Sequence, residues 1–248
     1  MASIQAAKKE LRKQIKQALT ALPQDAIAQQ TSRAVRALLA LPEYQAARRI
    51  SVYLSMPVGE ISTAAIVSDA IANGKKVFIP YTYQRSAQPE SRPKSIMDMV
   101  ELHSVRDLES FQPDKWGIPT PSAESIARRQ NSFGGKGLSE GDTDPARWGA
   151  DSGLDLIVVP GMIFDADLGR LGHGKGFYDF FLDRCQQYSA KLLGVRMPFL
   201  VGLALKEQLL LPAQSVPMDA TDWRLDALVV GDGAVLRSTK AQPTASMP

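Results

Sequence analysis

The order of hydrophobic and polar positions predicts a chain of alternating helices and strands. Residues 5–22 repeat apolar side chains at helical spacing, so we expect an amphipathic helix whose other faces are largely basic. A second helix is expected over 24–40, because Pro42 follows closely behind it. Residues 49–55 are almost unbroken in β-branched, aromatic and other apolar side chains, which is typical of a short buried strand.

The same alternation resumes in later parts of the chain. A helix ending near Gly74 is followed by a predicted strand over 77–83, and residues 97–102 are a further candidate strand. Strands are then expected over 154–164, 199–205 and 225–230, with an amphipathic helix over about 176–189. This pattern predicts the α/β class, with a mainly parallel sheet and helices on both faces.

Two segments lack this pattern. Residues 122–153 are rich in Gly, Ser, Asp and Arg without apolar periodicity, which predicts a surface insertion that is disordered or functional, with disorder favoured. Residues 237–248 are expected to form a flexible tail. We therefore expect a single domain over residues 1–236.

Composition and charge restrict the class of protein further. The 248 residues are 44% hydrophobic, enough for one sizeable core, and a formal net charge of +3 from mixed basic and acidic residues argues against a nucleic-acid partner. No apolar run is long enough to span a bilayer, so we expect no membrane association. The basic N-terminal stretch resembles a mitochondrial presequence, but Glu10 and the lack of Ser- and Arg-rich composition favour the cytoplasm. The lone Cys185 fits a reducing compartment, and a monomer is expected.

The most informative segment is GRLGHGKGFYD, residues 169–179, which lies between a predicted strand and a predicted helix. Backbone amides and a helix N-terminus in this arrangement can bind phosphate oxygens. Gly169, Gly174 and Lys175 match the phosphate-loop template, but Gly176 stands where a magnesium-binding hydroxyl is required. The dinucleotide-binding glycine spacing is also missing, so neither standard motif applies.

A carboxylate must then hold the magnesium ion of a bound ATP, because Mg²⁺ prefers carboxylates, water and phosphate oxygens. Asp179 lies one helical turn beyond Lys175 and can face the same phosphates. Asp226, before the last predicted strand, is the second candidate, although an ordinary role at a strand end is equally compatible with its position.

Several segments in order along the chain resemble the 5-formyltetrahydrofolate cyclo-ligases, also called 5,10-methenyltetrahydrofolate synthetases. The resemblance covers most of the chain and is more specific than any single glycine loop. Its elements are KKELR (8–12), EYQAARRISVYLSM (43–56), GEIST (59–63), KKVFIP (75–80), MDMV (97–100), WGIPTP (116–121), LDLIVVPGMIFD (154–165), RLGHGKGFYD (170–179), LALKEQL (203–209) and VPMDATDWRLDALV (216–229).

The resemblance implies a three-layer α/β sandwich and an ATP- and Mg²⁺-dependent enzyme. In the implied reaction, the formyl oxygen of 5-formyltetrahydrofolate attacks the γ-phosphate of ATP. The folate N10 then attacks the activated formyl carbon, and phosphate leaves as 5,10-methenyltetrahydrofolate forms beside ADP. The partners are therefore two small molecules, a reduced folate and ATP.

The resemblance also implies a set of site residues. The catalytic group is Lys175, Arg170 and His173. Asp179 and Asp226 match the metal positions. The folate contacts are Leu54, Glu60, His173, Gly174, Lys175, Gly176 and Phe177. The nucleotide contacts are Lys8, Lys9, Arg12, Trp116, Arg170, Leu171, Gly172, His173, Gly174, Lys175, Gly176, Phe177 and Tyr178.

The chain departs from the family pattern at three positions. The common RGKGYYD is HGKGFYD here, so His173 replaces an arginine and Phe177 replaces a tyrosine, and Tyr81 stands where an arginine is frequent. These changes weaken phosphate binding in principle, because a neutral imidazole attracts phosphate less than a guanidinium does. They keep two alternatives open: a folate-binding homologue with impaired catalysis, and another ATP-dependent small-molecule kinase or ligase.

Overall fold

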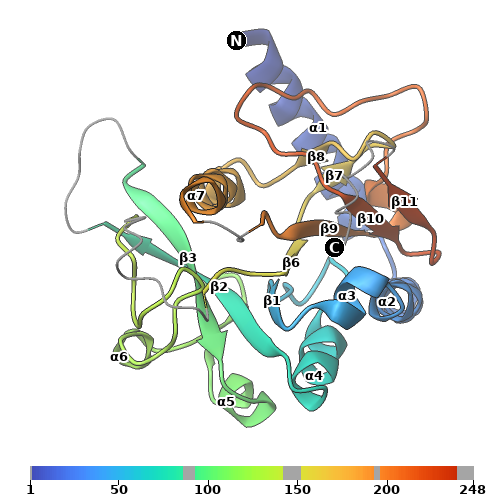
Figure 1. Cartoon of the computed structure of the whole chain (residues 1–248). Helices are drawn as coiled ribbons and strands as arrows, with labels where there is room; N and C mark the ends of the chain where they lie inside the picture. Colours follow the sequence, from blue (N-terminus) through green and yellow to red (C-terminus); the bar gives the residue numbers. More distant parts are fainter. Residues whose placement is uncertain (1, 86–92, 142–151, 193–195, 239–248) are drawn as a thin grey trace, which may run out of the picture.

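A seven-stranded sheet forms the centre of the protein (Figure 1). The computed structural model describes residues 2–85, 93–141, 152–192 and 196–238. Along the sheet the strand order is β11-β10-β9-β6-β1-β2-β3. These strands are β1 (Arg49–Val52), β2 (Lys76–Gln84), β3 (Ser95–Leu102), β6 (Leu156–Val159), β9 (Phe199–Ala204), β10 (Ala227–Val230) and β11 (Val235–Arg237). Two small ribbons pair β4 (Gln112–Pro113) with β5 (Pro119–Thr120), and β7 (Ile163–Phe164) with β8 (Arg170–Leu171).

The helices lie around this sheet in the order that the sequence predicts, with short additions. They are α1 (Ala2–Thr20), α2 (Gln24–Leu39), α3 (Pro42–Ala46), α4 (Ala64–Ala72), α5 (Val105–Glu109), α6 (Ala123–Ile126) and α7 (Phe177–Lys191), with a 3₁₀ turn η2 (Lys206–Gln208). Figure 1 shows α7 on one side of the sheet and α3 and α4 on the other.

Side-chain alternation along the strands produces two separate cores. In β6, Leu156 and Val158 belong to the core that packs against α2, α3 and α4, whereas Ile157 and Val159 belong to the core beneath α7. All four side chains are fully buried, as expected for a strand covered on both faces. The predicted three-layer α/β sandwich is therefore confirmed.

Strand direction places the loops that carry chemistry at one edge of the sheet. β1, β2, β6, β9 and β10 are parallel, and the two end strands β3 and β11 are antiparallel to their neighbours. Ligands of open α/β sheets bind outside the carboxyl ends of the parallel strands. The chain leaves β6 at this edge and passes through the small β7–β8 ribbon into the glycine-rich loop.

Residues 122–141, predicted as part of a disordered insertion, pack into the protein. Asn131, Ser132, Phe133 and Ser139 are buried, and the Phe133 ring lies 5.0 Å from that of Phe181 in α7. Disorder, the alternative favoured for this segment, is therefore wrong for 122–141, because contacts with distant residues replace the missing apolar periodicity. Residues 142–151 of the predicted insertion lie outside the described residues.

A buried charged network anchors this segment to the sheet. Asp98 of β3 is fully buried and accepts hydrogen bonds from the Ser139 backbone N–H at 2.6 Å and the Asn131 amide at 3.0 Å. Arg184 of α7 donates to the same carboxylate at 2.9 Å, and its guanidinium lies 4.5 Å from the Phe133 ring centroid. A buried carboxylate with this many donors fixes its neighbours in one arrangement.

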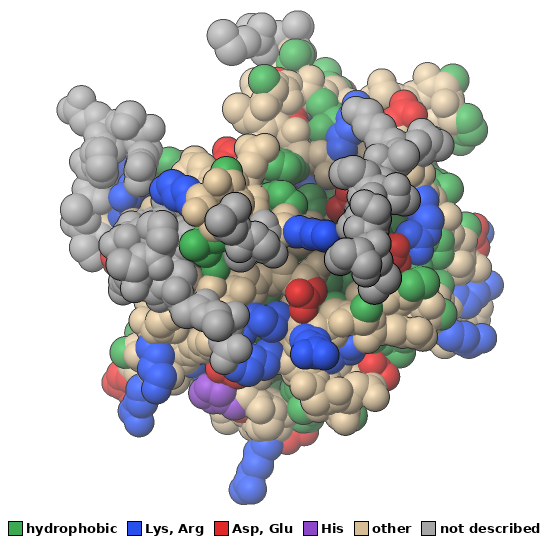
Figure 2. Space-filling view, in the orientation of Figure 1, with side chains coloured by type: hydrophobic (Ala, Val, Ile, Leu, Met, Phe, Trp, Pro, Cys, Tyr) green, Lys and Arg blue, Asp and Glu red, His purple; other side chains and the backbone are tan. Residues whose placement is uncertain are grey.

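The C-terminal end of the described chain belongs to the sheet. Arg237, which we expected in the flexible tail, is the last residue of β11 and donates to the Glu43 carboxylate at 2.7 Å. The remainder of the predicted tail, residues 239–248, lies outside the described chain. None of the described helices combines the length and the apolar character that crossing a membrane requires. Figure 2 shows acidic and basic side chains interspersed on the face it presents.

Candidate active site

The glycine-rich loop leads directly into the N-terminus of α7. Gly176 is the residue before the helix, in the left-handed conformation with φ of 67°, and Gly174 has φ of 92°. Glycine adopts this backbone conformation without the steric penalty of other residues. Because Gly176 has no side chain to cap the helix, the first N–H groups of α7 remain suited to an anion. His173 and Lys175 are both exposed on this loop.

Arg170 supports the loop from beneath. Its guanidinium is buried and donates to Asp179 in the first turn of α7 at 2.6 Å and to the Pro160 carbonyl at 3.3 Å. A Cβ at Gly172 would lie only 2.9 Å from Arg170 Nη1, so a glycine is needed for this close approach. Arg170 thus couples the loop to the helix and does not extend into solvent.

Helix α1 contributes cations to the same edge. Arg12 Nε donates to the Gly172 carbonyl at 2.8 Å, and a Cβ at Gly174 would lie 3.2 Å from Arg12 Cζ. Burial lowers the pKa of Arg12, and the negative charge of Asp222 opposes that effect. Lys9 is exposed. The structure therefore brings two of the predicted nucleotide residues, Arg12 and Lys9, onto the helix beside the loop.

Lys8 is also on α1 but is buried. Its ammonium group donates to Asp222 at 2.5 Å and to Asp219 at 3.0 Å. Burial acts to lower the pKa of Lys8, yet hydrogen bonds and charge from the two aspartates raise it overall. Hydrogen bonds from Thr221, with a contribution from Lys8, lower the pKa of Asp219 to about 2. Lys8 is therefore a charged residue, and both of its acidic partners are side chains of the protein itself.

The predicted folate residues lie next to the loop. Glu60 is largely buried, accepts a hydrogen bond from the Met56 backbone N–H at 3.0 Å, and lies 3.9 Å from His173 Nε2. Burial is the largest effect on the pKa of Tyr178 and raises it, and the negative charge of Glu60 raises it further. The positive charge of Arg170 opposes this rise. The Tyr178 hydroxyl is buried and has no hydrogen-bond partner among the described residues. Leu54, two residues beyond the end of β1, is also buried.

Trp116 belongs to a different part of the site edge. It is 63% exposed on the turn between β4 and β5. A Cβ at the next residue, Gly117, would approach Pro57 Cγ to 2.9 Å, so this turn lies against the segment that leads to Glu60. The surroundings of Trp116 thus connect it with the predicted folate side of the site.

Asp226 lies where the parallel strands β9 and β10 begin, and the N–H of its neighbour Leu225 donates to the Leu168 carbonyl, directly before the glycine loop. It precedes β10, and its carboxylate accepts from the Leu200 backbone N–H at 2.8 Å, where the parallel strand β9 begins. Burial raises the pKa of Asp226. The hydrogen bond from the Leu200 N–H fits the strand-end alternative, and in the part of the chain that the structure describes the carboxylates of Asp226 and Asp179 share no hydrogen-bond partner. Among the described residues, no group of three or more His, Cys, Asp or Glu side chains is arranged to hold a metal ion.

Sequence reasoning assigned no role to three carboxylates that organise this edge. Asp165 accepts from the Gly169 N–H at 2.7 Å and from the Val216 N–H at 2.8 Å, so it joins the glycine loop to the 216–222 segment. Asp219 and Asp222 are the partners of Lys8. All three lie within the quoted family motifs, which was the only signal available for them.

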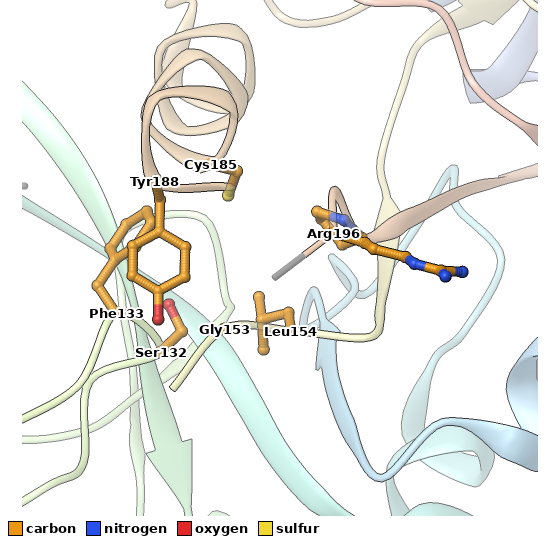
Figure 3. Close-up of a pocket in the computed structure, with 8 residues that line it drawn as sticks. Ser132, Phe133, Gly153, Leu154, Cys185, Tyr188 and Arg196 are labelled. Atoms are coloured by element: carbon orange, nitrogen blue, oxygen red, sulfur yellow. The ribbon is translucent and has the colours of Figure 1, made fainter. Parts of the chain in front are cut away.

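A separate small cavity lies beside the far end of α7 (Figure 3). It has a volume of about 10 Å³ and is lined by Ser132, Phe133, Cys185 and Tyr188, among others. Such a volume holds no more than about one water molecule. Burial raises the pKa of Cys185 to about 12, so this thiol stays protonated and is a poor nucleophile. The cavity is therefore part of the packed core beneath α7.

The three-layer fold and the uncapped helix behind a glycine-rich loop define an α/β protein with a candidate anion-binding site at the N-terminus of α7. Residues 4–231 match the model of the 5-formyltetrahydrofolate cyclo-ligase family. The chain belongs to this family of enzymes.

Individual relatives agree with this assignment. The chain is 34% identical over 241 residues to "5-formyltetrahydrofolate cyclo-ligase" of Saccharomyces cerevisiae, covering 93% of this chain and 98% of that protein. It is 31% identical over 228 residues to "Probable 5-formyltetrahydrofolate cyclo-ligase" of Schizosaccharomyces pombe, covering 92% and 97%. The solved structure of Aquifex aeolicus 5,10-methenyltetrahydrofolate synthetase has the same fold, with a TM-score of 0.62, 23% identity and coverage of 95% and 94%.

Proposed function

We propose that this protein converts 5-formyltetrahydrofolate and ATP into 5,10-methenyltetrahydrofolate, ADP and phosphate, with Mg²⁺. The observation that carries the proposal is the 3.9 Å approach of His173, on the glycine loop, to Glu60, on the predicted folate segment. Phosphoryl transfer to a formyl oxygen requires that the nucleotide and the folate meet in this way. Family membership supports the folate as the substrate.

Phosphate binding in the proposed site is divided among several groups. The N–H groups at the start of α7 and the exposed ammonium of Lys175 would bind phosphate oxygens, and Arg12 would add positive charge from α1. The reacting oxygen and N10 both belong to the folate, so the protein acts mainly by positioning and by stabilising charge. His173 lies between the two substrates and can donate to either when protonated.

Folate binding is assigned to Glu60 and Leu54. The buried Glu60 carboxylate can accept hydrogen bonds from the donor edge of a pterin ring, while Leu54 offers an apolar contact. Exposed Trp116 lies near the same segment and offers an aromatic face for either substrate. The unpaired hydroxyl of Tyr178 is a further polar group beside Glu60.

Asp179 is the residue we propose as the protein ligand of Mg²⁺. Its Oδ1 binds Arg170, and its side chain remains 22% exposed, so one oxygen is left for a hydrated ion. Mg²⁺ commonly takes one or two carboxylates and completes its coordination with water and phosphate oxygens. When bound, the ion would neutralise charge on the transferring phosphate. Asp226, whose carboxylate accepts the Leu200 backbone N–H, stays the second candidate ligand.

We further propose that the protein is a cytoplasmic monomer that binds neither nucleic acid nor membranes. The small net charge of +3 supports a protein that acts on small molecules, and the single buried cysteine supports a reducing compartment.

The direct test is to mix the purified protein with Mg-ATP and 5-formyltetrahydrofolate. Methenyl product is followed by its near-ultraviolet absorbance, and ADP is measured in parallel. Product and ADP in a ratio of one to one are the expected result. Folate binding without either product would instead favour an impaired folate-binding homologue, and ADP release without a folate requirement would favour another kinase or ligase.

Glu60→Gln is expected to raise the KM for the folate by about tenfold or more, because a hydrogen bond to a charged group contributes about 1.5–3 kcal/mol. The KM for ATP should change by less than about twofold if Glu60 contacts only the folate. Steady-state kinetics with each substrate varied in turn measure both values. Glu109→Gln, an exposed substitution in α5, serves as the control. An unchanged KM for the folate would remove Glu60 from the proposed site.

Asp179→Asn is expected to raise the Mg²⁺ concentration that gives half-maximal turnover by about tenfold, since an amide oxygen binds this ion more weakly than a carboxylate. The variant should also melt at a lower temperature, because buried Arg170 loses its charged partner. Magnesium titrations at fixed ATP and thermal unfolding separate the two effects. Lower stability with an unchanged magnesium requirement would leave Asp179 only its structural role.

A further inference from the structure

Helix α1 is held over the active-site edge by two cationic side chains one turn apart. Arg12 donates to the Gly172 carbonyl of the glycine loop at 2.8 Å, and Lys8 donates to Asp222 and Asp219 of the 216–222 segment. Leu11 lies between these two cations in the sequence, and Ile15 follows Arg12 by three residues. Both pack against a small apolar cluster formed by Ile163, Leu171 and Val216. The helix is thus fixed both to the loop and to the segment beside it.

Asp222 is the centre of the second attachment. One of its oxygens, Oδ2, accepts both the Lys8 ammonium at 2.5 Å and the Asp219 backbone N–H at 2.7 Å. Asp219 is held in turn by the Thr221 hydroxyl at 2.6 Å and the Thr221 N–H at 3.0 Å. The two carboxylates are therefore oriented toward Lys8 before any ligand arrives.

This arrangement gives Lys8 a different role from direct contact with phosphate. Only 5% of Lys8 is exposed, and two carboxylates already neutralise its charge. Arg12, one helical turn further along, keeps part of its surface exposed and lies against Gly174. Because a helix is stiff over one turn, fixing Lys8 also fixes the position of Arg12.

We infer that Asp222, assisted by Asp219, is a positioning residue for nucleotide binding, which anchors Lys8 and thereby holds Arg12 over the glycine loop. The inference rests on the proposed function, because it concerns the nucleotide that the loop would bind. Neither aspartate contacts the nucleotide in this account. Their effect reaches it through Lys8 and α1.

The first test is Asp222→Asn, whose amide oxygen can still accept the Asp219 N–H but carries no charge for Lys8. We expect the KM for Mg-ATP to rise by about tenfold, with kcat at saturating ATP and the KM for the folate within about twofold of wild type. Asp167→Asn, which removes one exposed carboxylate beyond β7, is the matched control and should leave all three values unchanged. An unchanged KM for Mg-ATP in Asp222→Asn would overturn the inference.

A double-mutant cycle with Lys8→Met tests whether Asp222 acts through Lys8. In the Lys8→Met background, Asp222→Asn should cause no further rise in the KM for Mg-ATP, because the interaction it removes is already absent. Lys8→Arg, which keeps the charge, should restore most of the wild-type affinity. An equal rise in both backgrounds would mean that Asp222 acts independently of Lys8, and the inference would be wrong.

Amide hydrogen exchange provides a readout that needs no turnover. Asp222→Asn should speed exchange in residues 8–16 of α1, whereas Asp167→Asn should not. Unchanged exchange would contradict the anchoring of the helix. A wild-type protein that forms no methenyl product would contradict the proposed function, whereas an active wild type with an unchanged KM in Asp222→Asn contradicts the inference alone.

Discussion

Lys175→Ala is expected to reduce turnover by about a thousandfold or more, as losses of this size follow removal of one group that stabilises developing charge. Lys175 is exposed, and among the described residues no hydrogen bond or ion pair involves its ammonium group. Its removal should therefore change the free energy of unfolding by no more than about 0.5 kcal/mol. Product formation at saturating substrates and chemical denaturation measure the two quantities.

The chain supplies a matched control for this substitution. Lys136 is also exposed and also lies between two glycines, Gly135 and Gly137, but it belongs to the segment anchored on Asp98. Lys136→Ala should leave turnover unchanged, and Lys175→Arg, which keeps a positive charge, should retain more activity than Lys175→Ala. Near-normal ADP release by Lys175→Ala would refute the assignment of the loop to phosphate binding.

Asp98→Ala is expected to destabilise the protein by about 3–5 kcal/mol, because it leaves the buried Arg184 guanidinium without its charged partner. Asp98 and Arg184 have side chains only 0% and 2% exposed, and the same carboxylate also binds Ser139 and Asn131. The substitution therefore also removes the side-chain hydrogen bonds that hold Asn131 and Ser139 on β3. Urea unfolding of the two proteins gives the difference in the free energy of unfolding.

Arg184→Met in the Asp98→Ala background separates the lost charge pair from the lost packing. The double variant should be more stable than Asp98→Ala alone, because no uncompensated charge then remains buried. A loss of less than about 1 kcal/mol in Asp98→Ala would contradict the role given to this network. Equal stability of the single and double variants would assign the loss to packing and to the neutral hydrogen bonds.

The local features of the site followed from the sequence. Gly174 and Gly176 adopt positive φ, and α7 begins at Phe177, directly after the predicted loop. These features depend on residues close together in the chain, where glycine and the apolar period act locally. The proximity of Glu60 to His173 rested on family resemblance, since 113 residues of sequence separation carry no local signal.

Other parts of the site depended on which strand lies beside which. Asp179 and Asp226 were both predicted as metal ligands, and in the structure the Asp179 carboxylate binds Arg170 whereas that of Asp226 accepts the Leu200 N–H of the neighbouring strand. Lys8 meets Asp219 and Asp222 more than 200 positions later in the chain. Neither fact can be obtained from spacing, because strand order and loop contacts arise only when the whole sheet is assembled.

The sequence by itself determined the alternation of helices and strands, the burial of β1 and the position of the glycine loop, because each follows from short-range periodicity and backbone preference. Only the tertiary structure decided that residues 122–141 are folded, because their stability comes from Asp98 and Arg184 on distant elements. It also decided that Lys8 is buried between two carboxylates, since a basic helix face looks the same in sequence whether it meets solvent or a partner.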